Sequence, residues 1–241
     1  MRLVLFACFF GFLCKFAYAY DMTTETLNLF DKARNRSILV ELYVSAELKN
    51  KSQIDKLPVA IISHGYAIKN TEYAFIANNL STQGYMVVSI QHDCKSDPKL
   101  PKTGDLLKKR MPFWEIGMQN ILFVMSELKR MEQNLDLNKV VLIGHSNGGD
   151  ISMFVAEKHP EFVSKVISLD SLRYPFPIAN HMPILSLRAN DTKADNGVIP
   201  ITGATIINIK DAKHIDMCDR GPELVKQEIV EFISNFLNCS L

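Results

Sequence analysis

The sequence predicts an α/β fold, with a mostly parallel central sheet covered by helices on both faces. The first observation is that short apolar runs, typical of buried strands, alternate along the chain with longer segments typical of helices. The second is that no internal repeat and no second domain is apparent. The third is size: 241 residues, 47% of them hydrophobic and 22% charged, are enough for one large core.

Seven segments are predicted as strands because they are short, apolar and mostly rich in β-branched residues. In chain order they are residues 38–44, 59–63, 85–90, 139–144, 166–169, 184–187 and 204–209.

Four longer segments are predicted as helices: residues 71–83, 113–131, 148–158 and 222–237. Tyr73, Ile76 and Leu80 give the first an apolar face, and Gly84 provides its C-terminal stop. The third ends near Pro160, because the residue before a proline disfavours helical backbone. The last is amphipathic, as a helix that closes over a sheet should be.

Two connections bear on the shape of a site. Residues 91–112 hold three prolines and no clear hydrophobic period, so they are predicted as the longest loop. Its basic run, residues 108–110, is either a solvated face or a rim for anionic substrates. Apart from the turn itself, only residues 173–182 separate the predicted strands 166–169 and 184–187. That leaves no room for a large lid.

The N-terminus has the pattern of a signal peptide. Arg2 precedes an apolar run, residues 3–14, and Ala17-x-Ala19 is a small-x-small cleavage pattern. We expect residues 1–19 to be cleaved after Ala19, leaving a domain of residues 20–241 that is secreted or periplasmic. The alternatives are a buried first element or an anchor, but the run is too short to span ~30 Å of hydrocarbon, so no stable membrane span is expected.

Charge and cysteine content narrow the function classes further. Cleavage would remove the two positive charges of Arg2 and Lys15, taking the formal charge from +1 to −1, so bulk charge gives no reason to expect a nucleic-acid partner.

Three cysteines would remain after cleavage: Cys94, Cys218 and Cys239. Either two of them pair, with Cys94 and Cys218 the candidates, or all three are free.

The strongest chemical signal is Gly144-His145-Ser146-Asn147-Gly148, between a predicted buried strand and a predicted helix. That context is what gives the G-x-S-x-G pattern its meaning, because the turn is sharp and lifts the serine hydroxyl above the sheet. The helix N-terminus there favours developing negative charge. Ser146 is therefore the expected nucleophile, the alternative being a glycine-rich turn without chemistry.

A serine nucleophile needs a base, and in proteins with this turn the chain order is serine, acid, histidine. His159 sits at a helix end and His181 precedes a strand, whereas His214 follows the last predicted strand. His214 is the expected base; the alternative is a surface histidine.

The acid is expected at Asp191, four residues beyond the strand that ends at Leu187. Asp195, which precedes Gly197, and Asp170, which directly follows the preceding strand, are the alternatives.

An oxyanion hole needs two backbone N–H donors. The expected donors are Asn147, after the nucleophile, and Tyr66, in the turn His64-Gly65-Tyr66 after an early strand. His64 falls in the wrong place in the chain order for a base, so we expect it to brace this turn by hydrogen bonding.

Residues 62–66, 144–149 and 190–192 together resemble the α/β-hydrolase superfamily. More narrowly the chain is similar to the lidless esterase branch, which includes platelet-activating-factor acetylhydrolase-like, dienelactone-hydrolase-like and cutinase-like enzymes. Residues 31–36 and 40–43 resemble the opening of the acetylhydrolase-like group. The resemblance implies an α/β-hydrolase fold and hydrolysis of esters by an acyl-enzyme route.

The expected function is therefore a serine hydrolase acting on small-molecule or lipid-like carboxylic esters. A thioesterase, a serine peptidase or amidase, or a non-catalytic binding protein on the same fold are the alternatives. No cofactor is expected, because the sequence has neither H-E-x-x-H nor C-x-x-C nor a glycine-rich phosphate loop.

Overall fold

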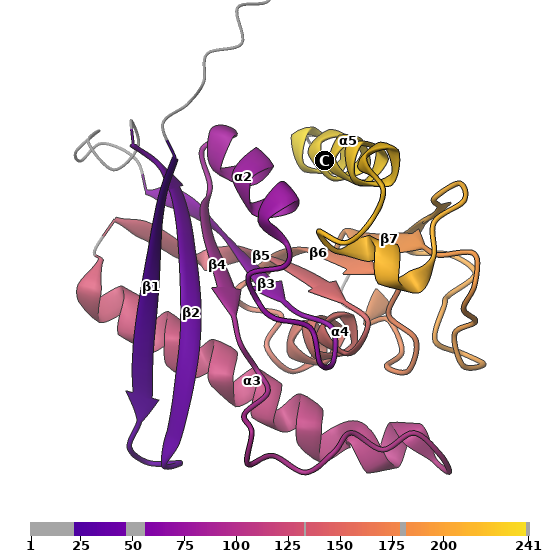
Figure 1. Cartoon of the computed structure of the whole chain (residues 1–241), viewed down its shortest axis with the longest axis horizontal. Coiled ribbons are helices and arrows are strands. Elements are labelled where there is room, and N and C mark those ends of the chain that lie inside the picture. Colours follow the sequence, from indigo (N-terminus) through magenta and orange to yellow (C-terminus); the bar gives the residue numbers. More distant parts are fainter. Residues whose placement is uncertain (1–21, 47–55, 133, 179–181, 240–241) are drawn as a thin grey trace, which may run out of the picture.

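The computed structural model describes residues 22–46, 56–132, 134–178 and 182–239. Within them, eight strands form one sheet in the order β1-β2-β4-β3-β5-β6-β7-β8 (Figure 1). β2 pairs antiparallel with β1 and β4, and all the other neighbours are parallel. The strands are β1 (Met22–Asp31), β2 (Arg36–Ser45), β3 (Leu57–Ser63), β4 (Met86–Ile90), β5 (Leu135–His145), β6 (Val163–Leu169), β7 (Ile184–Arg188) and β8 (Thr205–Asn208).

Helices cover both faces of the sheet. One face carries α3 (Leu106–Met131) and α4 (Asn147–Lys158), and the other carries α2 (Ala74–Thr82) and α5 (Glu223–Asn238) (Figure 1). A short 3₁₀ helix, η2 (His214–Met217), lies between β8 and α5. The predicted α/β class with a mostly parallel sheet is confirmed.

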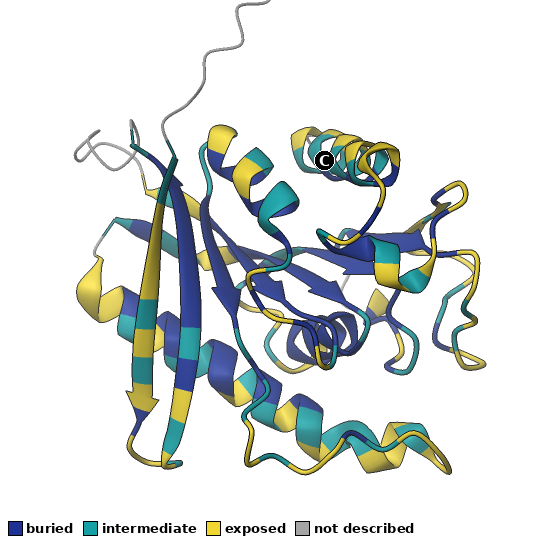
Figure 2. Cartoon of the chain, in the orientation of Figure 1, coloured by how far each residue is buried: buried dark blue, intermediate teal, exposed yellow. Residues whose placement is uncertain are grey.

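The alternation of side chains along each strand divides the core into two layers. In β3, Val59 and Ile61 pack with the α3 and α4 side, whereas Ala60 and Ile62 pack with the α2 and α5 side. The central strands are accordingly buried on both faces (Figure 2). Such double burial explains why their sequences are continuous apolar runs rather than alternating patterns.

The seven predicted strands and four predicted helices are all present, with shifted ends. The predicted loop 91–112 is wrong in its second part, because α3 begins at Leu106 and includes Pro112. Asp105 caps that helix by accepting a hydrogen bond from the backbone N–H of Lys108 (3.0 Å). Lys108 and Lys109 are exposed on its first turn, as a solvated face predicts.

Two elements had no counterpart among the predicted ones, β1 and η2. β1 is an edge strand that pairs along its whole length with β2, from Met22 opposite Ser45 to Asp31 opposite Arg36. Five of its ten residues are exposed and six are polar, so it lacks the continuous apolar run by which the buried strands are recognised.

The described part of the connection between β6 and β7, residues 170–178 and 182–183, contains no α-helix, in agreement with the predicted absence of a large lid. The predicted signal peptide, residues 1–19, lies outside the described residues. Among the residues that are described, no helix is both long and apolar enough to cross a bilayer.

Candidate active site

Three side chains that are distant in sequence meet beyond the carboxyl ends of the parallel strands. Ser146, directly after β5, has its Oγ 2.9 Å from Nε2 of His214. The other ring nitrogen of His214, Nδ1, lies 2.6 Å from Oδ2 of Asp170, which directly follows β6. The arrangement gives a hydroxyl a base within hydrogen-bond distance and gives that base an acid on its far side.

The turn around Ser146 has the strain that the motif predicts. Ser146 has φ 53° and ψ −118°, a left-handed φ that is rare for a residue with a side chain. A Cβ on Gly144 would lie 2.2 Å from the carbonyl oxygen of Gly148, and one on Gly148 would lie 2.1 Å from that of Ser63. Only glycine fits at either position, because in both cases the obstacle is backbone.

The expectation that Asp191 contacts the imidazole is wrong. Asp191 Oδ1 instead accepts a hydrogen bond from the backbone N–H of His214 (2.6 Å). Asp195, one of the two alternatives, forms an ion pair with Arg173. Asp170, the other alternative, is the carboxylate that faces the ring.

Strand register explains the place of Asp170. His145 is opposite Leu169, and Leu169 is opposite Leu187, on three neighbouring strands. Ser146 and Asp170 are thus the next residues after paired positions on adjacent strands, β5 and β6. The backbone N–H of Ser146 donates to the carbonyl of Leu169 (2.9 Å), which fixes this side-by-side arrangement. The sequence shows only that Asp170 directly follows its strand while Asp191 lies three residues beyond the end of β7; the register belongs to the assembled sheet.

Asp170 is fully buried and has four hydrogen-bond or ion-pair partners. His214 Nδ1 and the Thr192 hydroxyl (2.5 Å) lie at Oδ2. The Arg188 guanidinium (2.8 Å) and the backbone N–H of Ala189 (3.3 Å) lie at Oδ1. Burial alone raises the pKa of Asp170, but the hydrogen bond from His214, the charge of Arg188 and the Thr192 hydroxyl together hold that pKa below its ordinary value. Asp170 is therefore ionised at neutral pH.

The turn after β3 packs directly against the start of α4, as the close approach of Gly148 to the carbonyls of Ser63 and His64 shows. His64 braces this turn, as expected: its Nδ1 lies 2.7 Å from the carbonyl of Gly65, and its Nε2 accepts the backbone N–H of His92 (2.8 Å). Burial lowers the pKa of His64, so the ring is neutral and can donate from Nδ1 while it accepts at Nε2.

The two expected oxyanion donors, Asn147 and Tyr66, lie in these two packed segments. Asn147 is the first residue of α4, and its side-chain Oδ1 accepts the indole N–H of Trp114 (3.1 Å). Tyr66 lies in the turn after β3, and its hydroxyl accepts the backbone N–H of Leu100 (3.3 Å). Both side chains are thus occupied elsewhere.

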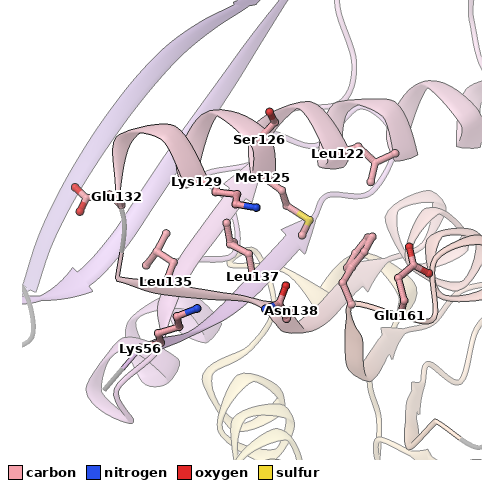
Figure 3. Close-up of a pocket in the computed structure, with 11 residues that line it drawn as sticks. Lys56, Leu122, Met125, Ser126, Lys129, Glu132, Leu135, Leu137, Asn138 and Glu161 are labelled. Atoms are coloured by element: carbon pink, nitrogen blue, oxygen red, sulfur yellow. The ribbon is translucent and has the colours of Figure 1, made fainter. Parts of the chain in front are cut away.

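Elsewhere a hollow of about 510 Å³ is lined by apolar side chains, among them Leu122, Met125 and Leu137, and by polar ones, among them Lys129 and Glu161 (Figure 3). It is formed by the last turns of α3, the start of β5 and the residue before β6. These are the amino ends of parallel strands, whereas Ser146 and Asp170 follow the carboxyl ends. The hollow is therefore remote from Ser146 and Asp170 and plays no part in the candidate site.

The three cysteines within the described residues form no disulfide. Cys94, Cys218 and Cys239 are all free, so the alternative without a pair is the one that the structure supports. Cys218 is buried in the core beside η2, and Cys239 is exposed at the end of α5. No group of three or more potential metal ligands occurs among the described residues.

Sequence comparison identifies two family profiles. The profile of the family described as "alpha/beta hydrolase fold" matches residues 61–191, more than half of the chain. The profile described as "Platelet-activating factor acetylhydrolase, isoform II" matches residues 13–99. A Haemophilus influenzae protein named "Putative esterase/lipase" is 30% identical over 101 residues, which are 42% of this chain and only 30% of that protein.

Solved structures share the fold at low sequence identity. The ferulic acid esterase from Streptomyces cinnamoneus superposes with a TM-score of 0.69 at 16% identity, over 92% of this chain and 90% of that one. The dienelactone hydrolase from Anabaena variabilis gives 0.58 at 16% identity, over 89% and 97%. An S-formylglutathione hydrolase from Agrobacterium tumefaciens gives 0.62 at 11%, over 90% and 95%. At these identities the likeness establishes the fold and not the substrate.

Proposed function

Because the chain belongs to the alpha/beta hydrolase fold family, we propose that it is a serine hydrolase that cleaves carboxylic esters through an acyl-enzyme. The observation that carries the proposal is the continuous chain of contacts Ser146 Oγ to His214 Nε2 (2.9 Å) and His214 Nδ1 to Asp170 Oδ2 (2.6 Å). The descriptions of the related proteins, several of them esterases, support the same bond type.

The mechanism follows from which atoms face each other. Ser146 Oγ attacks the acyl carbon while its proton passes to His214 Nε2. The tetrahedral intermediate collapses, and the leaving alcohol takes that proton. A water molecule then attacks the acyl-enzyme with His214 again as base, which releases the acid and restores Ser146.

The acid and the oxyanion donors stabilise the charges that form. Asp170 accepts the Nδ1–H of His214, which selects the tautomer whose Nε2 can take the serine proton, and its negative charge stabilises the imidazolium. We assign the oxyanion to the backbone N–H groups of Asn147 and Tyr66, at the start of α4 and in the turn packed against it.

The substrate class is a small or polymer-linked ester with a short acyl group. The short connection between β6 and β7 supports this choice, because it leaves the site without the large lid that would enclose a long acyl chain. A thioester or an amide would use the same residues, so bond type is decided by experiment.

The decisive experiment compares the wild type with Ser146→Ala on p-nitrophenyl esters of increasing acyl length. We expect Ser146→Ala to lower kcat on the order of 10³-fold or more. Ser126→Ala, in the remote hollow of Figure 3, is the matched control and should retain full activity. Wild-type rates from Ser146→Ala would end the proposal.

Two further measurements separate the alternatives. Thioester and amide substrates with the same acyl group as the best ester show which bond is preferred. Labelling with a fluorophosphonate tests for a binding protein, because folded protein without an adduct on Ser146 would favour that alternative over an enzyme.

We also propose that the protein is exported, on the basis of the signal-peptide pattern in residues 1–19. Expression of the full chain followed by N-terminal sequencing of the exported fraction should find Tyr20 as the first residue. Full-length protein retained inside the cell would contradict export and leave the catalytic proposal unaffected.

A further inference from the structure

A chain of buried hydrogen bonds links the turn of the oxyanion donor Tyr66 to the residue that serves as base. The backbone N–H of Gly65 lies 2.8 Å from the Tyr73 hydroxyl. That hydroxyl lies 2.8 Å from Nδ1 of His145, and Nε2 of His145 lies 3.0 Å from the backbone carbonyl oxygen of His214. Both linking side chains are almost completely buried.

The direction of each bond in this chain is determined. The carbonyl of His214 can only accept, so His145 Nε2 must donate. Burial and the nearby ring of His214 lower the pKa of His145 to about 3, so the imidazole is neutral and its Nδ1 accepts. Tyr73 therefore donates its proton to His145 and accepts from Gly65, and every group in the chain is satisfied.

The two ends of the chain belong to the two halves of the site. Gly65 precedes Tyr66, whose amide we assign to the oxyanion, and a Cβ on Gly65 would lie 2.9 Å from His145 Nδ1. At the other end, the backbone of His214 is held on both sides: Asp191 accepts its N–H (2.6 Å) and His145 donates to its carbonyl (3.0 Å). With the ring held by Asp170, the position of the base is fixed at three points.

A second set of contacts joins the same two segments beside Tyr73. Asp219 accepts the backbone N–H groups of Ala74 (3.0 Å) and Phe75 (3.1 Å), which start α2. The backbone N–H of Asp219 donates to the carbonyl of Glu72 (2.8 Å). The segment that follows His214 is therefore fastened to the start of α2, and the Tyr73–His145 pair is the part of this junction that reaches the catalytic residues.

We propose that Tyr73 and His145 are positioning residues, which hold the loop of His214 in register with the oxyanion turn so that base and oxyanion donor act on the same acyl carbon. The inference rests on the proposed ester hydrolysis. It concerns residues that do not touch the reacting atoms, so their loss should lower the rate of the chemical step more than it weakens binding of a short ester.

The first test is Tyr73→Phe, which keeps the ring and removes the hydroxyl that both neighbours need. We expect kcat to fall on the order of tenfold, with KM changed less than about threefold, because a buried N–H and a ring nitrogen lose their partner and the loop loses its register. Tyr85→Phe, at a half-buried tyrosine outside the site, is the matched control and should leave kcat unchanged.

The second test compares two substitutions of His145. Gln can still donate to the carbonyl of His214, whereas Leu cannot, so His145→Gln should retain more of the wild-type kcat than His145→Leu. Urea unfolding measures the stability of each variant. If the two variants lose the same free energy of unfolding but differ in kcat, a purely structural role of His145 does not explain the difference.

A third measurement needs no variant. The ¹⁵N chemical shifts of the imidazoles in the wild type should show His145 neutral at about pH 5, with its proton on Nε2. A charged ring or the Nδ1–H tautomer would overturn the inference, as would Tyr73→Phe within about twofold of wild type. If Ser146→Ala were fully active, the proposed function would fail instead, so the two outcomes are distinguishable.

Discussion

Arg188 Nη2 lies 2.8 Å from Oδ1 of Asp170, in an ion pair whose two side chains are almost entirely shielded from solvent. Nη1 of Arg188 also donates to the backbone carbonyl of Ser171 (2.6 Å), so the guanidinium is also bound to the residue that follows Asp170. A buried carboxylate is costly without compensation, and here the compensation is a full charge at the end of the next strand. The pair keeps Asp170 ionised and leaves its other oxygen for His214.

Removal of this guanidinium should damage both stability and rate. Arg188→Met leaves Asp170 buried without its countercharge, and we expect a loss of about 3–5 kcal/mol in the free energy of unfolding, measured by urea denaturation. Arg130→Met, which breaks the exposed pair with Glu127, is the control and should not shift the midpoint measurably. Equal midpoints for both variants would mean that the Arg188–Asp170 pair contributes little.

The identity of the acid is tested by two parallel substitutions. Asp170→Asn should lower kcat on the order of 10⁴-fold, because an amide cannot hold the imidazole tautomer as a carboxylate does. Asp191→Asn should cost less than about tenfold, since its amide oxygen can still accept the backbone N–H of His214. Steady-state kinetics on one ester decide the matter, and the reverse ranking would return the acid to Asp191.

That Ser146 and His214 meet could be predicted from sequence, because each is marked by local pattern: a glycine-flanked turn for Ser146 and the position after the last strand for His214. The aspartate that faces His214 could not be predicted in this way, because position after a strand locates the backbone and not the side chain. Asp170 is selected by the register of β5 against β6 and by the charge of Arg188, both of which exist only once the sheet is assembled.

The same distinction applies to the fold. Apolar runs predict buried strands, and β3 to β7 were predicted from them. β1 is held by pairing with β2 and has no such run. The first turns of α3 carry Pro112 and a basic run, which locally favour a loop, yet the Asp105 cap and the buried packing of Trp114 make them helical. Tertiary contacts outweighed local propensity there.

The backbone of Gly148 lies so close to the carbonyl of Ser63 that adding a single methyl group at this turn should abolish activity. Gly148→Ala places a Cβ 2.1 Å from the carbonyl oxygen of Ser63, so the turn must move and we expect the variant to be inactive. Gly84→Ala is the informative comparison: its Cβ would meet nothing within 4 Å, and only its φ of 96° opposes the change. It should lose about 1–2 kcal/mol of stability and remain active, as measured by unfolding and ester turnover.

A buried carboxyl group gives the protein a specific dependence of stability on pH. Asp150, in the first turn of α4, is fully buried; Oδ1 accepts the backbone N–H groups of Leu172, Arg173 and Tyr174, and Oδ2 has no hydrogen-bond partner. Burial raises its pKa from 3.8 to about 6, although those N–H groups oppose the shift. The folded protein therefore favours the protonated form more than the unfolded chain does.

The sign of the effect follows from this shift. The stabilising contribution of Asp150 is complete below the unfolded pKa of 3.8 and is lost as the pH rises through about 6. Asp150→Asn keeps an oxygen for the three N–H groups and cannot ionise. Between about pH 4 and pH 7 the wild type should therefore lose about 2–3 kcal/mol of unfolding free energy relative to Asp150→Asn, measured by urea denaturation across that range. Parallel pH profiles for the two proteins would show that Asp150 keeps an ordinary pKa in the folded state.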